Sequence, residues 1–216
     1  ATKESINKLL NDISKKSKIK GKKDYKEILK YSKKDNLDLW DIGYYLEKMK
    51  DNEFGFKQED LKPYLEFNKV LNGLFQLSNK LFDINIIEVN KNEENIDVWD
   101  KDVRYFRVYD KKDDKEEIAS FYLDPYIRNG EKKGGAWMDQ CIGKSKILNH
   151  KPVAYLVLNG APASKGKPSL MTLDEMETLF HEFGHGLQHM LTNIDEALVA
   201  GINNIEWDAV ELPSQF

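Results

Sequence analysis

The sequence predicts an α+β fold in which helices predominate, and three observations lead to this prediction. Apolar residues recur at three- and four-residue spacing over residues 1–83, strand-like segments follow from Ile84, and a helical pattern returns after Thr172. The first spacing is typical of a helix with one buried face, whereas alternation is typical of a half-buried strand. We therefore expect a helical segment over residues 1–83, then a small, mainly antiparallel sheet and a long helix over residues 84–216.

In the first segment, helices are expected over residues 6–13, 24–32, 37–50 and 58–82. A basic stretch that contains a glycine, residues 14–23, is expected to interrupt the first two, and residues 51–55 are expected to form a loop.

In the second segment, strands are expected over residues 86–89, 103–110, 117–123 and 152–158. A glycine-rich loop is expected over residues 124–137. Its Gly134-Gly135 pair is not followed by the Lys-Ser/Thr that completes a nucleotide-binding loop, so a nucleotide site is not expected.

Composition and charge argue against two kinds of partner. A net charge of −4 gives no electrostatic reason to expect nucleic acid. No apolar run approaches the length of a membrane span, so no membrane partner is expected. The single cysteine, Cys141, cannot form an intrachain disulfide and fits a reducing compartment. We expect a cytoplasmic location, with an organelle such as a mitochondrion or plastid as the alternative.

The last helix has a clear start and carries a metal-binding pattern. Thr172 and Glu175 have the spacing of a capping box, in which each side chain bonds the other residue's backbone N–H. Further along, the sequence reads H-E-F-G-H from His181 to His185. Positions four apart share one face of a helix, so these two histidines can bind a single ion. Glu182 lies beside them and is the candidate general base.

A catalytic zinc ion bound by two histidines needs a third protein ligand, and several acidic residues follow the helix. Asp195 and Glu196 follow it too closely to fold back easily, whereas Glu206 and Glu211 lie 25 and 30 residues after His181. Spacing alone does not choose between them, and Glu211 can also be read as a helix-capping residue. Asp208 is a candidate acceptor for a ligand histidine's N–H, with a purely structural role equally expected.

The two remaining histidines are not expected to bind the ion. His189 lies four residues after His185, but three ligands on consecutive turns of one straight helix cannot surround one ion. We expect His189 to pack or to support a ligand, and His150, in a polar loop, to have no role.

Three runs carry a resemblance to a known family: F-Y-L-D-P-Y-I-R-N-G-E-K-K-G-G-A-W-M-D-Q-C, T-L-F-H-E-F-G-H-G-L-Q-H-M-L-T and W-D-A-V-E-L-P-S-Q-F. They resemble the oligopeptidase A/thimet oligopeptidase family of zinc metallopeptidases. The resemblance implies a zincin-like catalytic domain that binds Zn²⁺ through His181, His185 and Glu211, with Glu182 as general base. It also implies hydrolysis of short peptides.

The resemblance further implies that the substrate pairs with an edge strand, which we expect to include Ala154, Leu156, Leu158 and Gly160. Relatives have a G-I-S-G-V type loop where this chain has residues 201–205, and their later tyrosine and histidine residues have no counterpart before Phe216. The chain is therefore expected to be a central piece, truncated at both ends, whose site the remainder of the parent polypeptide completes. The alternative is a non-catalytic zinc-binding fragment that needs the missing part for activity.

Overall fold

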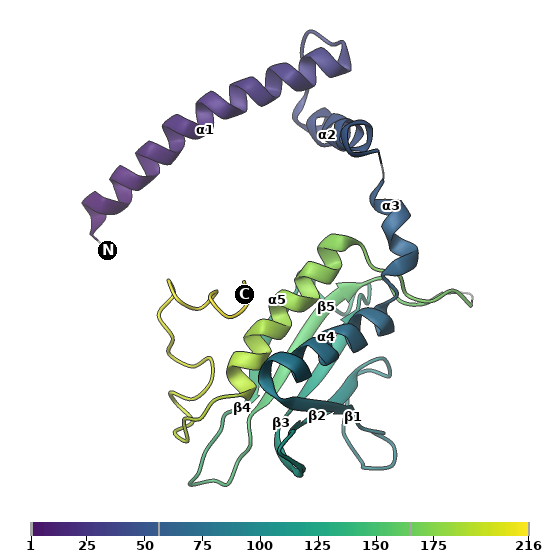
Figure 1. The fold of residues 1–216 in the computed structure, drawn as a ribbon, viewed down its shortest axis with the longest axis vertical. Coiled ribbons are helices and arrows are strands. Elements are labelled where there is room, and N and C mark those ends of the chain that lie inside the picture. Colours follow the sequence, from purple (N-terminus) through teal and green to yellow (C-terminus); the bar gives the residue numbers. More distant parts are fainter. Residues whose placement is uncertain (1, 56, 165, 216) are drawn as a thin grey trace. The chain divides into compact units, whose positions relative to one another are not determined.

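The computed structural model describes residues 2–55, 57–164 and 166–215 (Figure 1). They form two compact units, Ala1–Asp60 and Leu61–Phe216, each considered by itself. The first contains helices α1 (Lys3–Ser32) and α2 (Leu39–Phe54). None of the described helices has the length and apolar character needed to cross a membrane.

Helix α1 is continuous, so the break expected at residues 14–23 is wrong. Lysine is a good helix former, and three lysine–carboxylate pairs four residues apart support this stretch, among them Lys20 and Asp24 at 2.6 Å. A single interior glycine, Gly21, weakens such a helix without ending it. Helix α2 likewise continues through most of the expected loop and ends at Gly55, whose φ of 71° suits glycine.

The helix expected over residues 58–82 is divided into α3 (Gln58–Leu61), a 3₁₀ turn (Lys62–Tyr64) and α4 (Phe67–Phe82). The division arises because the backbone at Leu65 and Phe67 bonds that of residues 169 and 171 instead of continuing a helix. Helix α4 packs against β1 and lies in the second unit, so the units divide at Asp60 and not at the expected residue 83.

The second unit is built on a five-stranded sheet with the order β1-β2-β3-β5-β4. Its strands are β1 (Ile84–Glu88), β2 (Arg104–Asp110), β3 (Asp113–Tyr126), β4 (Trp137–Ile142) and β5 (Val153–Gly160). All neighbouring pairs are antiparallel except β3 and β5, so the expectation of a mainly antiparallel sheet is confirmed.

Helices α4 and α5 (Leu173–Met190) cover one face of this sheet (Figure 1). The core between the layers includes Leu71 from α4, Phe183 from α5, and Phe106, Phe121 and Leu156 from the strands. Because side chains alternate along a strand, the opposite face carries a different set, in which the rings of Trp99 and Tyr105 both contact Tyr122.

Strand β4 was not expected, because residues 137–142 follow the glycine-rich loop and include Asp139 and Gln140. Because β4 is present, β5 is an interior strand of the sheet. Strand β5 lies between β3 and β4 and pairs with both. The expectation that Ala154, Leu156, Leu158 and Gly160 belong to an edge strand is therefore wrong, and β4 is the edge on that side of the sheet.

Candidate metal centre

Helix α5 presents the two histidines of the H-E-F-G-H motif side by side. The expected capping box is present: the N–H of Thr172 donates to Glu175 Oε2 at 2.7 Å, and the N–H of Glu175 donates to Thr172 Oγ1 at 3.1 Å. His181 and His185 lie in the middle of the helix, with ring centroids 4.9 Å apart and ring planes perpendicular. The helix thus directs both rings to the same region of space.

Glu211 meets the two histidines from outside the helix. Its Oε2 atom lies 3.2 Å from Nε2 of His181 and 3.2 Å from Nε2 of His185. Two atoms bound to one tetrahedral zinc ion at about 2.0–2.1 Å lie roughly 3.3–3.4 Å apart. The two distances from Glu211 are close to this value, and the nitrogen and oxygen donors of the three residues all lie within 4.8 Å of one another, so this group could hold a metal ion.

The Glu211 carboxylate is held by a neighbour that the sequence reading did not single out. The hydroxyl of Ser214 lies 2.9 Å from Glu211 Oε2 and can donate a hydrogen bond to it. This hydrogen bond, followed by the two histidines, lowers the pKa of Glu211 below its ordinary value. Glu211 therefore stays ionised, as a metal ligand must be.

Glu182 is buried beside the histidines, and its environment suits proton transfer and not metal binding. Burial raises the pKa of its carboxyl, although His181 and His185 and a backbone hydrogen bond from Met138 of β4 oppose that rise. A carboxylate with a raised pKa is a better proton acceptor, which suits a general base. Glu182 and His181 also line an open cavity together with Ala136, Thr178 and Ser214.

The other candidate residues lie apart from this group. Among the described residues, only His181, His185 and Glu211 form a cluster able to hold a metal ion. Asp195 pairs with Lys144 at 3.2 Å. Asp208 is exposed, and within the described residues its carboxylate makes no hydrogen bond to either histidine. The Nδ1 atom of His185 is buried there without a hydrogen-bond partner.

His189 has a packing role. It is fully buried, and its Nε2 atom lies 3.0 Å from the carbonyl oxygen of Ile142, at the end of β4. Burial lowers the pKa of this imidazole. Gly201, with a φ of 65°, packs directly on His189, where a Cβ atom would collide with the ring and the backbone. The neighbouring Asn203 amide donates to the carbonyl oxygens of Ala197 and Ala200, both at 3.0 Å, and so holds this loop.

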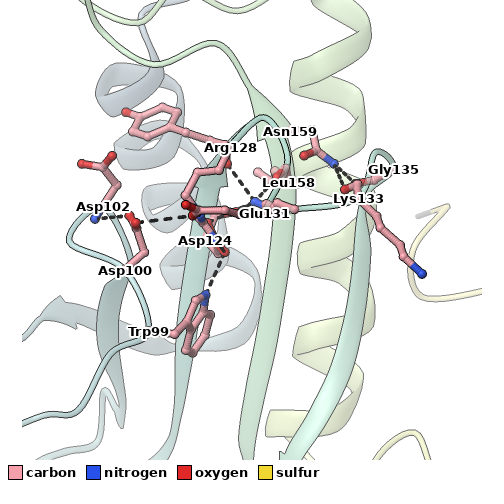
Figure 2. A network of polar contacts seen from close by, with 12 residues as sticks. Trp99, Asp100, Asp102, Asp124, Arg128, Glu131, Lys133, Gly135, Leu158 and Asn159 are labelled. Atoms are coloured by element: carbon pink, nitrogen blue, oxygen red, sulfur yellow. Dashed lines mark hydrogen bonds and ion pairs between the residues drawn. The ribbon is translucent and has the colours of Figure 1, made fainter.

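A buried ion-pair network anchors the loop that leads into β4. Arg128 and Trp99 converge on Asp124 (Figure 2), and their side-chain nitrogens lie 2.7–2.9 Å from its carboxylate oxygens. Lys132 also pairs with Asp124 at 3.0 Å, and its ammonium group donates to carbonyl oxygens of β3 and β5. The Asn159 amide donates to the backbone of residues 133 and 135. The loop is therefore anchored near its start, at Asp124, and near its end, at residues 133–135. Strand β4 follows directly, and its Met138 lies beside Glu182.

Comparison with known proteins identifies the family. The sequence model of peptidase family M3 matches residues 1–216. The chain belongs to peptidase family M3. Oligopeptidase A of Escherichia coli, an M3 relative, is 45% identical over 214 residues, which cover 96% of this chain and 30% of that protein. The family expected from the sequence is thereby confirmed.

Two further relatives carry different names. The organellar oligopeptidase A of Arabidopsis thaliana, described as chloroplastic/mitochondrial, is 48% identical over 188 residues, or 84% of this chain and 23% of that protein. The dipeptidyl carboxypeptidase of Escherichia coli is 37% identical over 177 residues, or 82% of this chain and 25% of that protein. The chain thus spans 23–30% of the length of these three M3 proteins.

Proposed function

We propose that this chain carries the metal centre of a zinc-dependent metalloendopeptidase that hydrolyses short peptides. The observation that supports it most directly is the convergence of Glu211 Oε2 on the Nε2 atoms of His181 and His185, with the buried Glu182 beside them. Membership of peptidase family M3 supports the same reaction class. We propose His181, His185 and Glu211 as the ligands and Glu182 as the general base.

When bound, zinc supplies Lewis acidity that polarises a peptide carbonyl and lowers the pKa of water. Glu182 then takes a proton from the attacking water onto its carboxylate and delivers it to the leaving amine. The burial that raises the pKa of Glu182 supports this role, because the protonated carboxyl is less disfavoured there than in water.

Strand β4 is the proposed support for the substrate backbone. Its outer edge has no partner strand among the described residues, and Met138, which bonds Glu182, lies in it. An extended peptide can add to such an edge through main-chain hydrogen bonds. A peptide there lies beside the proposed zinc site without requiring any rearrangement of β5.

A second candidate function follows from the length of the chain relative to its relatives. Because it spans 30% of Escherichia coli oligopeptidase A, it can be a zinc-binding piece that hydrolyses peptides only together with the rest of the polypeptide. Relatives include proteins named organellar and probable cytosolic, so for location we retain a cytoplasmic proposal with an organelle as the alternative.

The ligand assignment is tested by zinc affinity, measured by competition with a chromogenic chelator. The wild-type chain is expected to bind one zinc ion per molecule. His181→Ala and Glu211→Ala are each expected to weaken binding by more than about tenfold, because a ligand is lost. Glu206→Ala is the matched control and should leave the affinity unchanged. If Glu206→Ala removes the zinc and Glu211→Ala does not, the assignment is wrong.

The role of Glu182 is tested by cleavage of a quenched fluorescent peptide. Glu182→Gln should retain zinc and lose roughly 10²–10⁴-fold in rate, the usual contribution of a general base. Bound zinc without any chelator-sensitive cleavage by the wild-type chain would support the second candidate function instead.

A further inference from the structure

Gly184 lies between the two histidines and touches backbone, not side chains. A Cβ atom added there would lie 2.7 Å from the Cα atom of Ser214 and 2.8 Å from the carbonyl oxygen of Pro213. Distances below 3.0 Å are essentially never adopted by real Cβ atoms. Helix α5 and the segment after Glu211 can therefore approach this closely only because position 184 has no side chain.

The backbone conformation of Gly184 does not explain the glycine, since the residue lies within the α-helix. A glycine inside a helix is unfavourable relative to alanine, because more backbone entropy is lost on folding. The residue is thus a poor choice for the helix itself. Its benefit lies in the contact that its missing side chain allows.

That contact lies next to the third proposed ligand. Pro213 and Ser214 follow Glu211 by two and three residues, and the Ser214 hydroxyl lies 2.9 Å from both the carbonyl oxygen and Oε2 of Glu211. The Glu211 side chain is half exposed and lies in a turn, outside any helix or strand. Two contacts therefore hold the Glu211 carboxylate over the two Nε2 atoms. One is the contact of its segment with the helix at Gly184, and the other is the hydrogen bond from the Ser214 hydroxyl.

We propose that Gly184 and Ser214 are positioning residues for the third metal ligand: Gly184 sets the distance between helix and ligand segment, and Ser214 sets the direction of the carboxylate. The inference rests on the proposed zinc site. A methyl group at position 184 would push the backbone of Ser214 back by about 0.7 Å to reach ordinary contact at 3.4 Å. Functional groups must be held within about 0.5 Å, so this displacement is enough to misplace Glu211.

A merely structural role for Gly184 predicts a different result. If the close contact served only to stabilise the fold, Gly184→Ala would lower the melting temperature of the metal-free chain. Pro213 and Ser214 themselves are only partly buried, and Trp207 and Leu212 of the same segment are 92% and 72% exposed. Little packing is therefore lost when the segment moves, and alanine strengthens the helix. A positioning role predicts weaker zinc binding together with an unchanged or higher melting temperature without metal.

The experiment uses the full 216-residue chain and measures two quantities: the zinc dissociation constant and the melting temperature in excess chelator. Gly184→Ala is expected to raise the dissociation constant about 10–100-fold, the range found when groups supporting a metal ligand are lost. The matched control is Gly186→Ala in the same helix. Its Cβ would meet side-chain atoms of Leu156 at 3.2 Å and Met190 at 3.6 Å, so it should change the melting temperature and leave zinc affinity unchanged.

Two further variants keep the proposal testable if Gly184→Ala does not fold. Ser214→Ala should weaken zinc binding, and Ser214→Thr, which keeps a hydroxyl, should restore part of it. In a Glu211→Ala background, neither Gly184→Ala nor Ser214→Ala should weaken binding further, because both act through Glu211.

The inference would be overturned if wild type and Gly184→Ala bound zinc with equal affinity. It would also be overturned if Gly184→Ala weakened zinc binding as much in the Glu211→Ala background as in the wild type. Either result would leave the proposed zinc site standing. A wild-type chain that binds no zinc would overturn the proposed site and this inference with it.

Discussion

Asp124 is a buried carboxylate that faces two cations and an indole N–H. Its side chain is 3% exposed and accepts from Arg128, Trp99 and Lys132. Burial alone would raise the pKa of Asp124, but these hydrogen bonds outweigh it and lower the pKa below its ordinary value. The ionised form therefore stabilises the folded state.

Replacing Asp124 by asparagine should destabilise the chain by about 3–5 kcal/mol at pH 7, because the buried Lys132 loses its carboxylate partner and Arg128 keeps only the more distant Asp100 and Glu131, at 3.8 and 3.9 Å. Urea denaturation measures the difference. Since the folded pKa lies below the unfolded value of about 3.9, the contribution is present above that pH and lost as pH falls through the folded pKa. The gap between variant and wild type should therefore narrow below about pH 4.

Glu131→Gln is the control for this prediction. Glu131 faces the same Arg128 at 3.9 Å but is 77% exposed, so its loss should change stability by less than about 1 kcal/mol. A gap between wild type and Asp124→Asn that stays constant from pH 7 to pH 3 would show that the ion pairs do not cause the destabilisation.

At the same scale, the sequence identified the candidate site only where its residues are close in the chain. His181, Glu182 and His185 were found from their spacing, because a helix converts that spacing into a shared face. Spacing could not distinguish Glu211 from Glu206 in this way. Which of them folds back onto α5 depends on how the segment after the helix packs, and residues distant in the sequence determine that packing. Ser214 and Gly184 were missed for the same reason, although the E-x-x-S spacing was a visible signal.

Among the elements, helix α5 owes its start to the Thr172–Glu175 capping box. Thr172→Ala should destabilise the metal-free chain by about 1 kcal/mol, because the N–H of Glu175 loses its acceptor. His181 lies nine residues further on, so zinc affinity should not change. The control is Thr178→Ala in the same helix, which removes no cap and replaces threonine by a better helix former. Equal destabilisation by both variants would contradict the capping role.

The elements that local pattern missed share one cause. Strand β4 lies at the edge of the sheet and is only partly buried, so it lacks the apolar alternation that marked the other strands. The apolar spacing lapses between residues 14 and 23, so the sequence predicts two helices where the structure has the single helix α1. Lysine–carboxylate pairs keep this stretch helical. Both forms depend on contacts that an apolar pattern does not record.

At the scale of the whole molecule, the main core belongs to the second unit. Its buried residues lie between Phe67 and Met190, whereas the buried hydrophobic residues described in the first unit are Ile28 and Leu37. A chain of residues 61–216 should therefore unfold in one cooperative transition and bind zinc with the affinity of the full chain. Thermal unfolding followed by circular dichroism, with the chelator competition, measures both.

A chain of residues 84–216 is the informative comparison, because it begins at the boundary expected from the sequence. It lacks α4, and with it Phe67, Leu71 and Leu74 of the core. It should lose cooperative unfolding. If it unfolds as cooperatively as residues 61–216, the core of the second unit does not depend on α4.

The parallel pairing of β3 with β5 also has a consequence for the order of events during folding. Ser120 pairs with Val153, so more than thirty residues must be closed into a loop before the first contact between these strands forms. Closing such a loop costs chain entropy before any contact repays it, which makes parallel pairing slow compared with a hairpin such as β2–β3. Lys132 lies inside that loop and bonds carbonyl oxygens of both strands. Its ammonium group is therefore expected to be among the last to leave water, and its burial marks the completion of the sheet.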